Sequence, residues 1–342
     1  TNTLTVNGSL TLAPTSVLNV AIDGTAAGQF GSLDVTGGVV RNGALSATTG
    51  GGYVPVNGDF VPFLKSGVAA TGTFSPVSAP AGFAVGYNVA LGEAARLIFS
   101  AASVDTFTNA AGGLNWENPG NWSNLALPGL LDSALISTGT GIAVTHAVGT
   151  DTIASLTVNA TNSLDVSGGS SLTVLGNTSL GGALTISGVG TTAALNGGLN
   201  GGATGQLTVT GGSLTLANGA ALASYTQSAG GFAGAGALTV GQRFNQTGGT
   251  LSGFTSASLT DTSASPLAIA SISAGTVTAT GANGISIGSG GQITTTATGR
   301  ALVLDAGGGS FFNGSNASAL NATGGGTWLV YTSDPATATF NG

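Results

Sequence analysis

A short apolar–polar–apolar triplet, followed by a glycine-rich turn, recurs along this sequence of 342 residues and constrains its fold more than any other feature. In each copy the first and third residues face one way and the middle Thr or Asp faces the other, which is the period of two of a β-strand. We therefore expect many short strands separated by tight turns. Typical copies are Leu4–Val6, Leu156–Val158, Leu164–Val166, Leu172–Val174 and Leu207–Val209.

The triplets are themselves part of a longer sequence repeat. The segment Tyr225–Gly234 aligns with Phe244–Gly253 at a constant offset of 19 residues, so that Gln227 matches Gln246. Short strands that repeat every 19 residues or so are typical of a coil of a parallel β-solenoid, whose coils stack about 4.8 Å apart. We predict an all-β parallel solenoid in which Gln227 and Gln246 lie one coil apart on the same face.

The composition suits a narrow solenoid core and excludes several other classes of protein. Gly supplies 61 residues, and it permits the positive φ angles that tight corners need. Charged residues make up 5% of the chain, against about 25% in a typical domain, which argues against both a disordered chain and a basic nucleic-acid surface. With no Cys, the chain has neither disulfides nor Cys-based metal sites.

The pattern divides the chain into three segments. Residues 1–103 are expected to form a solenoid segment with a less regular strand-rich block near 53–99, where aromatic residues and prolines increase and antiparallel strands are expected to close the segment. Residues 104–135 form a connector that contains two tryptophans, and residues 136–342 form the repetitive rod. The chain starts at Thr1 without a signal peptide, so we expect it to be part of a longer protein.

Four aromatic residues are candidates for interaction or capping. Trp116 and Trp122 lie six residues apart in the connector, where they would form either a sugar-stacking platform or a plug for the open end of the rod. Trp328 and Tyr331 lie in the last predicted strand, whose backbone groups need partners.

Catalytic, metal-binding and cofactor-binding residues are not predicted. No two of the twelve acidic residues are closer than eleven positions, whereas a glycoside-cleaving site needs paired carboxylates. His146 is the single histidine and has only Asp151 as a nearby acid, so we expect a surface residue or a satisfied core residue.

Several segments resemble the filamentous-haemagglutinin-type exoproteins of two-partner secretion systems, and the spacing of Trp116, Trp122, Pro128 and Asp132 is similar to one found in autotransporter-like β-helix surface proteins. The resemblance implies a right-handed parallel β-helix and export across the outer membrane of a Gram-negative bacterium. The segments that carry the first resemblance are Gly248–Gly253, Gly299–Ala306, Phe312–Asn313 and Gly326–Pro335.

These observations lead to a ranked set of functional hypotheses. The first is a non-catalytic, secreted cell-surface protein: the β-helical shaft of an adhesin or extracellular fibre that mediates attachment and biofilm formation. The second is a self-assembling subunit of an extracellular filament, and the third is a β-helix enzyme that degrades polysaccharides. The expected partners are an outer-membrane secretion pore during export, further copies of the chain, and a glycan or protein receptor, but not nucleic acid.

Overall fold

The computed structural model describes residues 3–56, 58–68, 70–80, 82–88, 92–99, 102–139 and 141–341. It separates into two compact units, Thr1–Ser103 and Val104–Gly342. The only helical elements among the described residues are two 3-10 turns, η1 (Pro119–Asn121) and η2 (Pro335–Thr337). Neither is long or apolar enough to cross a membrane. The prediction of an all-β chain is confirmed.

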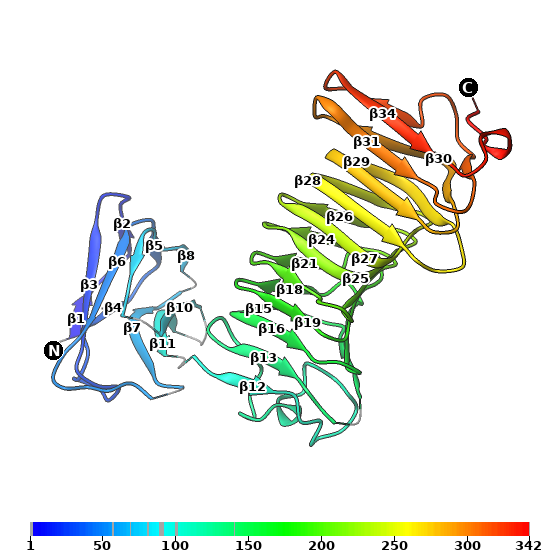
Figure 1. Cartoon of the computed structure of the whole chain (residues 1–342). Coiled ribbons are helices and arrows are strands. Elements are labelled where there is room, and N and C mark those ends of the chain that lie inside the picture. The colour runs from blue at the N-terminus through cyan, green and yellow to red at the C-terminus, as the bar shows by residue number, and fades with distance from the viewer. Residues whose placement is uncertain are drawn as a thin grey trace. The chain divides into compact units, whose positions relative to one another are not determined.

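The second unit is a parallel β-solenoid with three strands in each coil. Its 23 strands form one sheet, and every ladder within it is parallel (Figure 1). From β25 onward several strands bend at a corner and so belong to more than one column of the stack. The predicted parallel solenoid is confirmed for this unit.

The strands of the second unit fall into three columns. The first column contains β12 (Val104–Thr106), β13 (Ser133–Ile136), β16 (Ser155–Val158), β19 (Thr178–Leu180), β22 (Leu199–Asn200), β25 (Ala220–Gln227), β27 (Ala237–Gln246), β28 (Thr250–Asp261), β29 (Leu267–Gly281), β31 (Gly299–Asp305) and β34 (Gly326–Tyr331). The second contains β14 (Ala143–His146), β17 (Ser163–Val166), β20 (Ala183–Ile186), β23 (Gln206–Val209), parts of β25, β27 and β29, β30 (Ile285–Thr295) and β32 (Phe311–Asn313). The third contains β15 (Thr150–Ile153), β18 (Ser171–Val174), β21 (Thr192–Leu195), β24 (Ser213–Leu216), β26 (Gly231–Gly234), parts of β28, β29 and β30, and β33 (Leu320–Ala322).

The predicted 19-residue register is confirmed where the sequence alignment placed it. Gln227 pairs with Gln246 on the neighbouring coil, and the Gln246 Nε2 donates to the Gln227 Oε1 at 3.0 Å. Other coils differ in length, because their corners differ: Ser133 pairs with Ser155, 22 residues along, and Leu302 pairs with Trp328, 26 residues along. The strands therefore keep their stacking while the turns absorb insertions.

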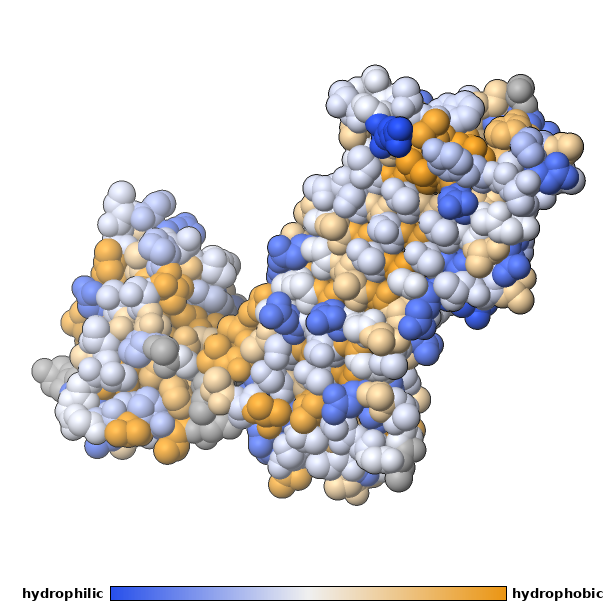
Figure 2. Space-filling view, viewed as in Figure 1, coloured by the Kyte–Doolittle hydropathy of each residue, from blue (hydrophilic) through white to orange (hydrophobic). Residues whose placement is uncertain are grey.

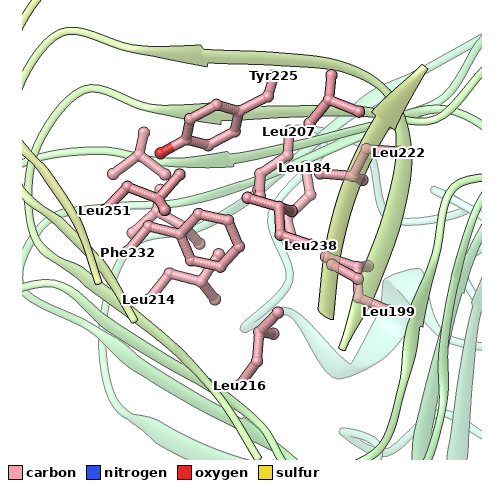
Figure 3. Close-up of a cluster of buried hydrophobic side chains, with 14 of the residues drawn as sticks. Leu184, Leu199, Leu207, Leu214, Leu216, Leu222, Tyr225, Phe232, Leu238 and Leu251 are labelled. Carbon is pink, nitrogen blue, oxygen red and sulfur yellow. The ribbon is translucent and has the colours of Figure 1, made fainter. Parts of the chain in front are cut away.

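Strand alternation fills the interior of the second unit with aliphatic side chains. One continuous cluster of buried residues extends from Phe107 to Ala319. Figure 3 shows side chains from the three columns, among them Leu207, Phe232 and Leu238, pointing into a shared interior. Burying each such side chain is worth about 1.5–3 kcal/mol, so this continuous core holds the coils together.

The corner at Gly168 shows why the coils need glycine. Its φ is +63°, in the left-handed region, and an added Cβ would lie 2.3 Å from the carbonyl oxygen of Ala147 on the preceding coil. A larger residue would both strain the backbone and force two coils apart.

The first unit is a shorter three-sided stack closed by antiparallel strands. One sheet contains β1 (Thr3–Val6), β4 (Ser32–Val35), β7 (Phe60–Ser66), β11 (Glu93–Phe99) and β10 (Phe83–Tyr87). The others contain β2 (Leu10–Leu12), β5 (Val39–Arg41) and β8 (Thr71–Gly72), and β3 (Val17–Ile22), β6 (Ala44–Thr49) and β9 (Val77–Ser78). The ladders of β11 with β7 and with β10 are antiparallel, which confirms the closing antiparallel strands expected within 53–99.

A buried arginine joins the irregular block of the first unit to its coils. Arg41 is 1% exposed, and its guanidinium donates to the carbonyl oxygens of Ala70, Gly72 and Ala94. It also lies 4.9 Å from the centre of the Tyr87 ring. Burial lowers the pKa of Arg41, an effect that the nearby Tyr87 partly offsets.

Candidate functional site: the ends of the solenoid in the second unit

The connector covers the first coil of the solenoid. β12 pairs with β13, and Asn115 forms a parallel bridge to Thr145 of β14. The Trp116 N–H donates to the Thr145 carbonyl, and the Thr145 N–H donates to the Leu114 carbonyl, each at 2.9 Å. The connector thus takes the place of a preceding strand and satisfies the edge of β14.

Two asparagines shape this part of the connector. The Asn118 side chain accepts from the Gly120 N–H at the start of η1, a position where Asn is favoured because its oxygen satisfies a free backbone donor. Asn121 is fully buried; its Nδ2 donates to the carbonyls of Gly112 and Asn115, and its Oδ1 accepts from the Ala111 N–H. These bonds hold the loop in the shape that turns both tryptophans inward.

Trp116 and Trp122 form a buried plug. Their rings pack edge to face with centres 4.7 Å apart, and Phe107 packs edge to face on Trp122 at 5.1 Å. The Trp122 Nε1 donates to the Trp116 carbonyl at 2.8 Å. Exposed fractions of 0% and 1% leave no ring face on which a sugar could stack, so of the two hypotheses the geometry agrees with the plug.

A charged cluster that the sequence did not predict lies beside this plug. The His146 side chain is fully buried; its Nδ1 lies 3.1 Å from the Glu117 Oε1, and its Nε2 lies 3.2 Å from the Asp151 Oδ2. The imidazole stacks on Trp116 with ring centres 5.5 Å apart. The expectation that Asp151 is the single acid near His146 is therefore wrong, because the connector brings Glu117 to the other side of the ring.

Both carboxylates of this cluster are fixed by other donors. The Glu117 Oε1 accepts from the N–H groups of Ala147 and Val148 at 2.8 and 2.9 Å. The Asp151 Oδ2 accepts from the Trp116 Nε1 at 3.0 Å. Because the acids face opposite edges of the imidazole, they do not converge on one point, and no group of three metal-ligating side chains is found among the described residues.

At the other end of the solenoid, β34 leaves aromatic side chains exposed. Trp328 and Val330 pair with Leu302 and Leu304, so they face the same side as buried core residues, but no further coil covers them within the described chain. Trp328 is 46% exposed and Tyr331 is 51% exposed. Figure 2 shows hydrophobic side chains, coloured orange, over β31 and β34.

The residues after β34 cover only part of this end. Thr339 bridges Phe312 in parallel, and the Asn313 side chain donates to the Phe340 carbonyl at 2.7 Å, so the edge of β32 is occupied. Beside it lies a cleft of about 130 Å³ lined by Phe311, Asn313, Ala317, Leu320, Trp328 and Phe340. Among the described residues β34 has a strand partner on one side only.

The first unit contains a larger cleft of about 370 Å³, which Asp59, Phe60 and Lys65 help to line. Asp59 is fixed by the Tyr53 hydroxyl, which donates to its Oδ2 at 2.5 Å. Burial, together with this hydrogen bond and the nearby charge of Asp59, raises the pKa of Tyr53 to about 12. The Arg96 guanidinium lies 4.6 Å from the centre of the Phe60 ring. The sequence did not single out these residues, because they are separated along the chain and follow no motif.

Comparisons with models of known protein families, with curated proteins and with solved structures found no match for this chain.

Proposed function

We propose that the chain is the non-catalytic β-solenoid shaft of a bacterial surface adhesin or extracellular fibre. The observation that carries this proposal is the continuous buried core of the second unit, which runs through successive coils from Phe107 to Ala319. Stacked coils of this kind contact only their neighbours, so such a rod can be extended coil by coil to hold a binding surface away from a cell.

The character of the exposed strand positions supports a mechanical role. The outward positions of the coils are mostly Ser and Thr, and hydroxyl groups bond from coil to coil, as from Thr192 to Ser171 at 2.9 Å and from Ser155 to Ser133 at 2.8 Å. Such contacts strengthen the stack without forming a reactive centre.

Export across an outer membrane, by way of a secretion pore, belongs to the same proposal. It is supported by the resemblance of Gly326–Pro335 and related segments to filamentous-haemagglutinin-type exoproteins, and by the absence of Cys, since disulfides formed in an oxidising periplasm would hinder passage of an unfolded chain.

Deleting whole coils tests the shaft hypothesis. β18 starts at Ser171, and its partners two coils on start at Ser213, so removing residues 171–212 joins the chain in register. The rod should fold and be shorter by about 10 Å, at about 4.8 Å for each coil. Beads coated with this variant should attach to cells and to abiotic surfaces to the same extent as beads coated with the parent chain do.

A folded deletion variant that no longer attaches would contradict the shaft role, because the binding surface would then lie in the removed coils. As a matched control, a deletion of residues 171–202 ends within a coil, so that β23 would follow in the place of β18, the later strands would no longer match the columns of the earlier coils, and folding should be prevented.

A second candidate function, a self-assembling filament subunit, is favoured by the partly unpaired strand β34. An unpaired strand edge is a template for another strand, and a head-to-tail contact propagates because it does not close on itself. The low charge of the chain offers little repulsion between copies.

The substitution Val330→Asp tests the filament function. It places a charge on the side of β34 that faces the core, and burying that charge under an added coil should abolish polymers seen by electron microscopy at a cost of several kcal/mol. Thr327→Asp is the matched control, because Thr327 is exposed on the same strand. Normal polymers from folded Val330→Asp protein would eliminate assembly through this strand.

A further inference from the structure

We propose that the charge on His146 controls how tightly residues 104–135, here called the connector cap, hold the first coil of the solenoid. The imidazole links two separate elements. Glu117 belongs to the connector cap and Asp151 to β15, and the buried ring lies between their carboxylates at 3.1 and 3.2 Å. The ring also stacks on the aromatic face of Trp116.

The two forms of the ring interact differently with these surroundings. An imidazolium carries an N–H on both nitrogens, whereas the neutral ring carries one and turns the lone pair of the other toward an acceptor. Here both nitrogens face carboxylate oxygens, although neither contact is aligned as a hydrogen bond. A protonated ring would therefore be held by charge, whereas a neutral ring would face two ionised carboxylates with no positive charge between them.

The carboxylates cannot easily turn away when the ring loses its proton. The Glu117 Oε1 is held by the N–H groups of Ala147 and Val148, and the Asp151 Oδ2 is held by the Trp116 Nε1. The unfavourable contact between the carboxylates and the neutral ring then has to be relieved by movement of the connector cap, which carries Glu117 and Trp116. This movement would break the bonds to Ala147 and Val148 first.

Movement of the connector cap would uncover the edge of β14. The connector cap occupies the edge of β14 through Leu114, Asn115 and Trp116. A loosened cap would expose that edge as a template for strand addition. The cap should be tightest where the imidazole is protonated and both carboxylates are ionised, and it should loosen as rising pH removes the ring proton or as strong acid neutralises Glu117 and Asp151.

Two signals in one NMR titration of the whole chain test this inference. His146 is the only histidine, so its ring resonances report its own protonation without overlap. Hydrogen exchange at the Ala147 and Val148 amides reports closure of the cap, and the Thr247 amide, which donates to the Gln227 carbonyl farther along the rod, corrects for the general effect of pH. Relative to Thr247, protection of the two amides should fall at least about tenfold as the ring loses its proton.

Two variants make the test decisive. In His146→Gln the relative protection should be low and independent of pH over the range in which the parent ring titrates. Should that variant not fold, Glu117→Gln keeps an acceptor for Ala147 and Val148 but removes one charge from beside the ring, and the change in their relative protection with pH should be smaller than in the parent chain. Unchanged protection across the ring titration, a ring that does not titrate in the folded chain, or an identical pH response in His146→Gln would overturn the inference.

Discussion

Replacing Gln246 by leucine should destabilise the solenoid far more than its position in a strand suggests. Gln246 is 1% exposed, and its amide closes a bend of the neighbouring coil. Its Oε1 accepts from the N–H groups of Ala270 and Ser271 at 3.1 Å each, and its Nε2 donates to the Ser271 carbonyl at 2.8 Å and to the Gln227 Oε1 at 3.0 Å. On the side of the preceding coil, the ladder of β29 stops at Ala268 and resumes at Ile272, so those backbone groups have no ladder partner there.

The expected loss follows from the number of orphaned groups. Leucine has a similar volume, so the cavity term is small, but two backbone N–H groups lose their acceptor and two oxygens lose a donor. A buried polar group left without a partner costs about 1–3 kcal/mol, and some of the oxygens keep other donors. We therefore expect the free energy of unfolding to fall by about 3–5 kcal/mol.

Chemical denaturation followed by circular dichroism measures this loss, and hydrogen exchange at Ala270 and Ser271 locates it. The matched control is Gln242→Leu, because the Gln242 amide makes one hydrogen bond, to the Ala203 carbonyl, at the surface. A loss for Gln246→Leu no larger than for Gln242→Leu would refute the argument that the glutamine stack replaces ladder hydrogen bonds at the bend.

Three further perturbations test the caps and the first unit. Trp122→Ala should cost about 3–5 kcal/mol in the second unit, because the ring is buried between Trp116 and Phe107, and thermal unfolding of the variant measures it. Arg41→Met should lower the melting temperature of the first unit because three carbonyls, two of them in buried contacts, lose a donor, and Arg41→Lys should restore only part of it. Because the pKa of Tyr53 is raised from 10.0 to about 12, its neutral phenol stabilises the folded state below pH 10, and this contribution is lost as the pH rises through 12. In Tyr53→Phe the free energy of unfolding should fall less steeply between pH 9 and 12 than in the parent chain. An unchanged dependence on pH would contradict this prediction.

The strands and their stacking could be predicted because their information is local. The alternation in Leu172–Val174 specifies which side chains face inward, and the Gln227–Gln246 alignment specifies a register. Coil lengths could not be predicted in the same way, because a corner such as the one at Gly168 accepts different numbers of residues as long as the backbone can turn.

The contacts of individual residues outside the repeats were harder to predict. The burial of Trp116 follows from its place before the first coil, where an open core needs a cover. The contact between Glu117 and His146 beside Trp116 could not be predicted, since the two residues are 29 positions apart and share no repeat. Arg41 was missed for the same reason: three of its four acceptors are backbone carbonyls, which leave no trace in the sequence.

The physical difference between inner and terminal coils explains where individual chemistry is found in this chain. An inner coil has a neighbour on each side, so most of its backbone and core need only the repeated triplets, and the bend closed by Gln246 is an exception. In the first coil of the second unit, β14 lacks a preceding strand of its column, and the chain covers this end with Trp116, Glu117 and Asn121, none of which fits the repeat. β34 lacks a following strand within the described residues and keeps Trp328 and Tyr331 exposed. A solenoid of this design should tolerate the gain or loss of whole inner coils better than changes at its two ends.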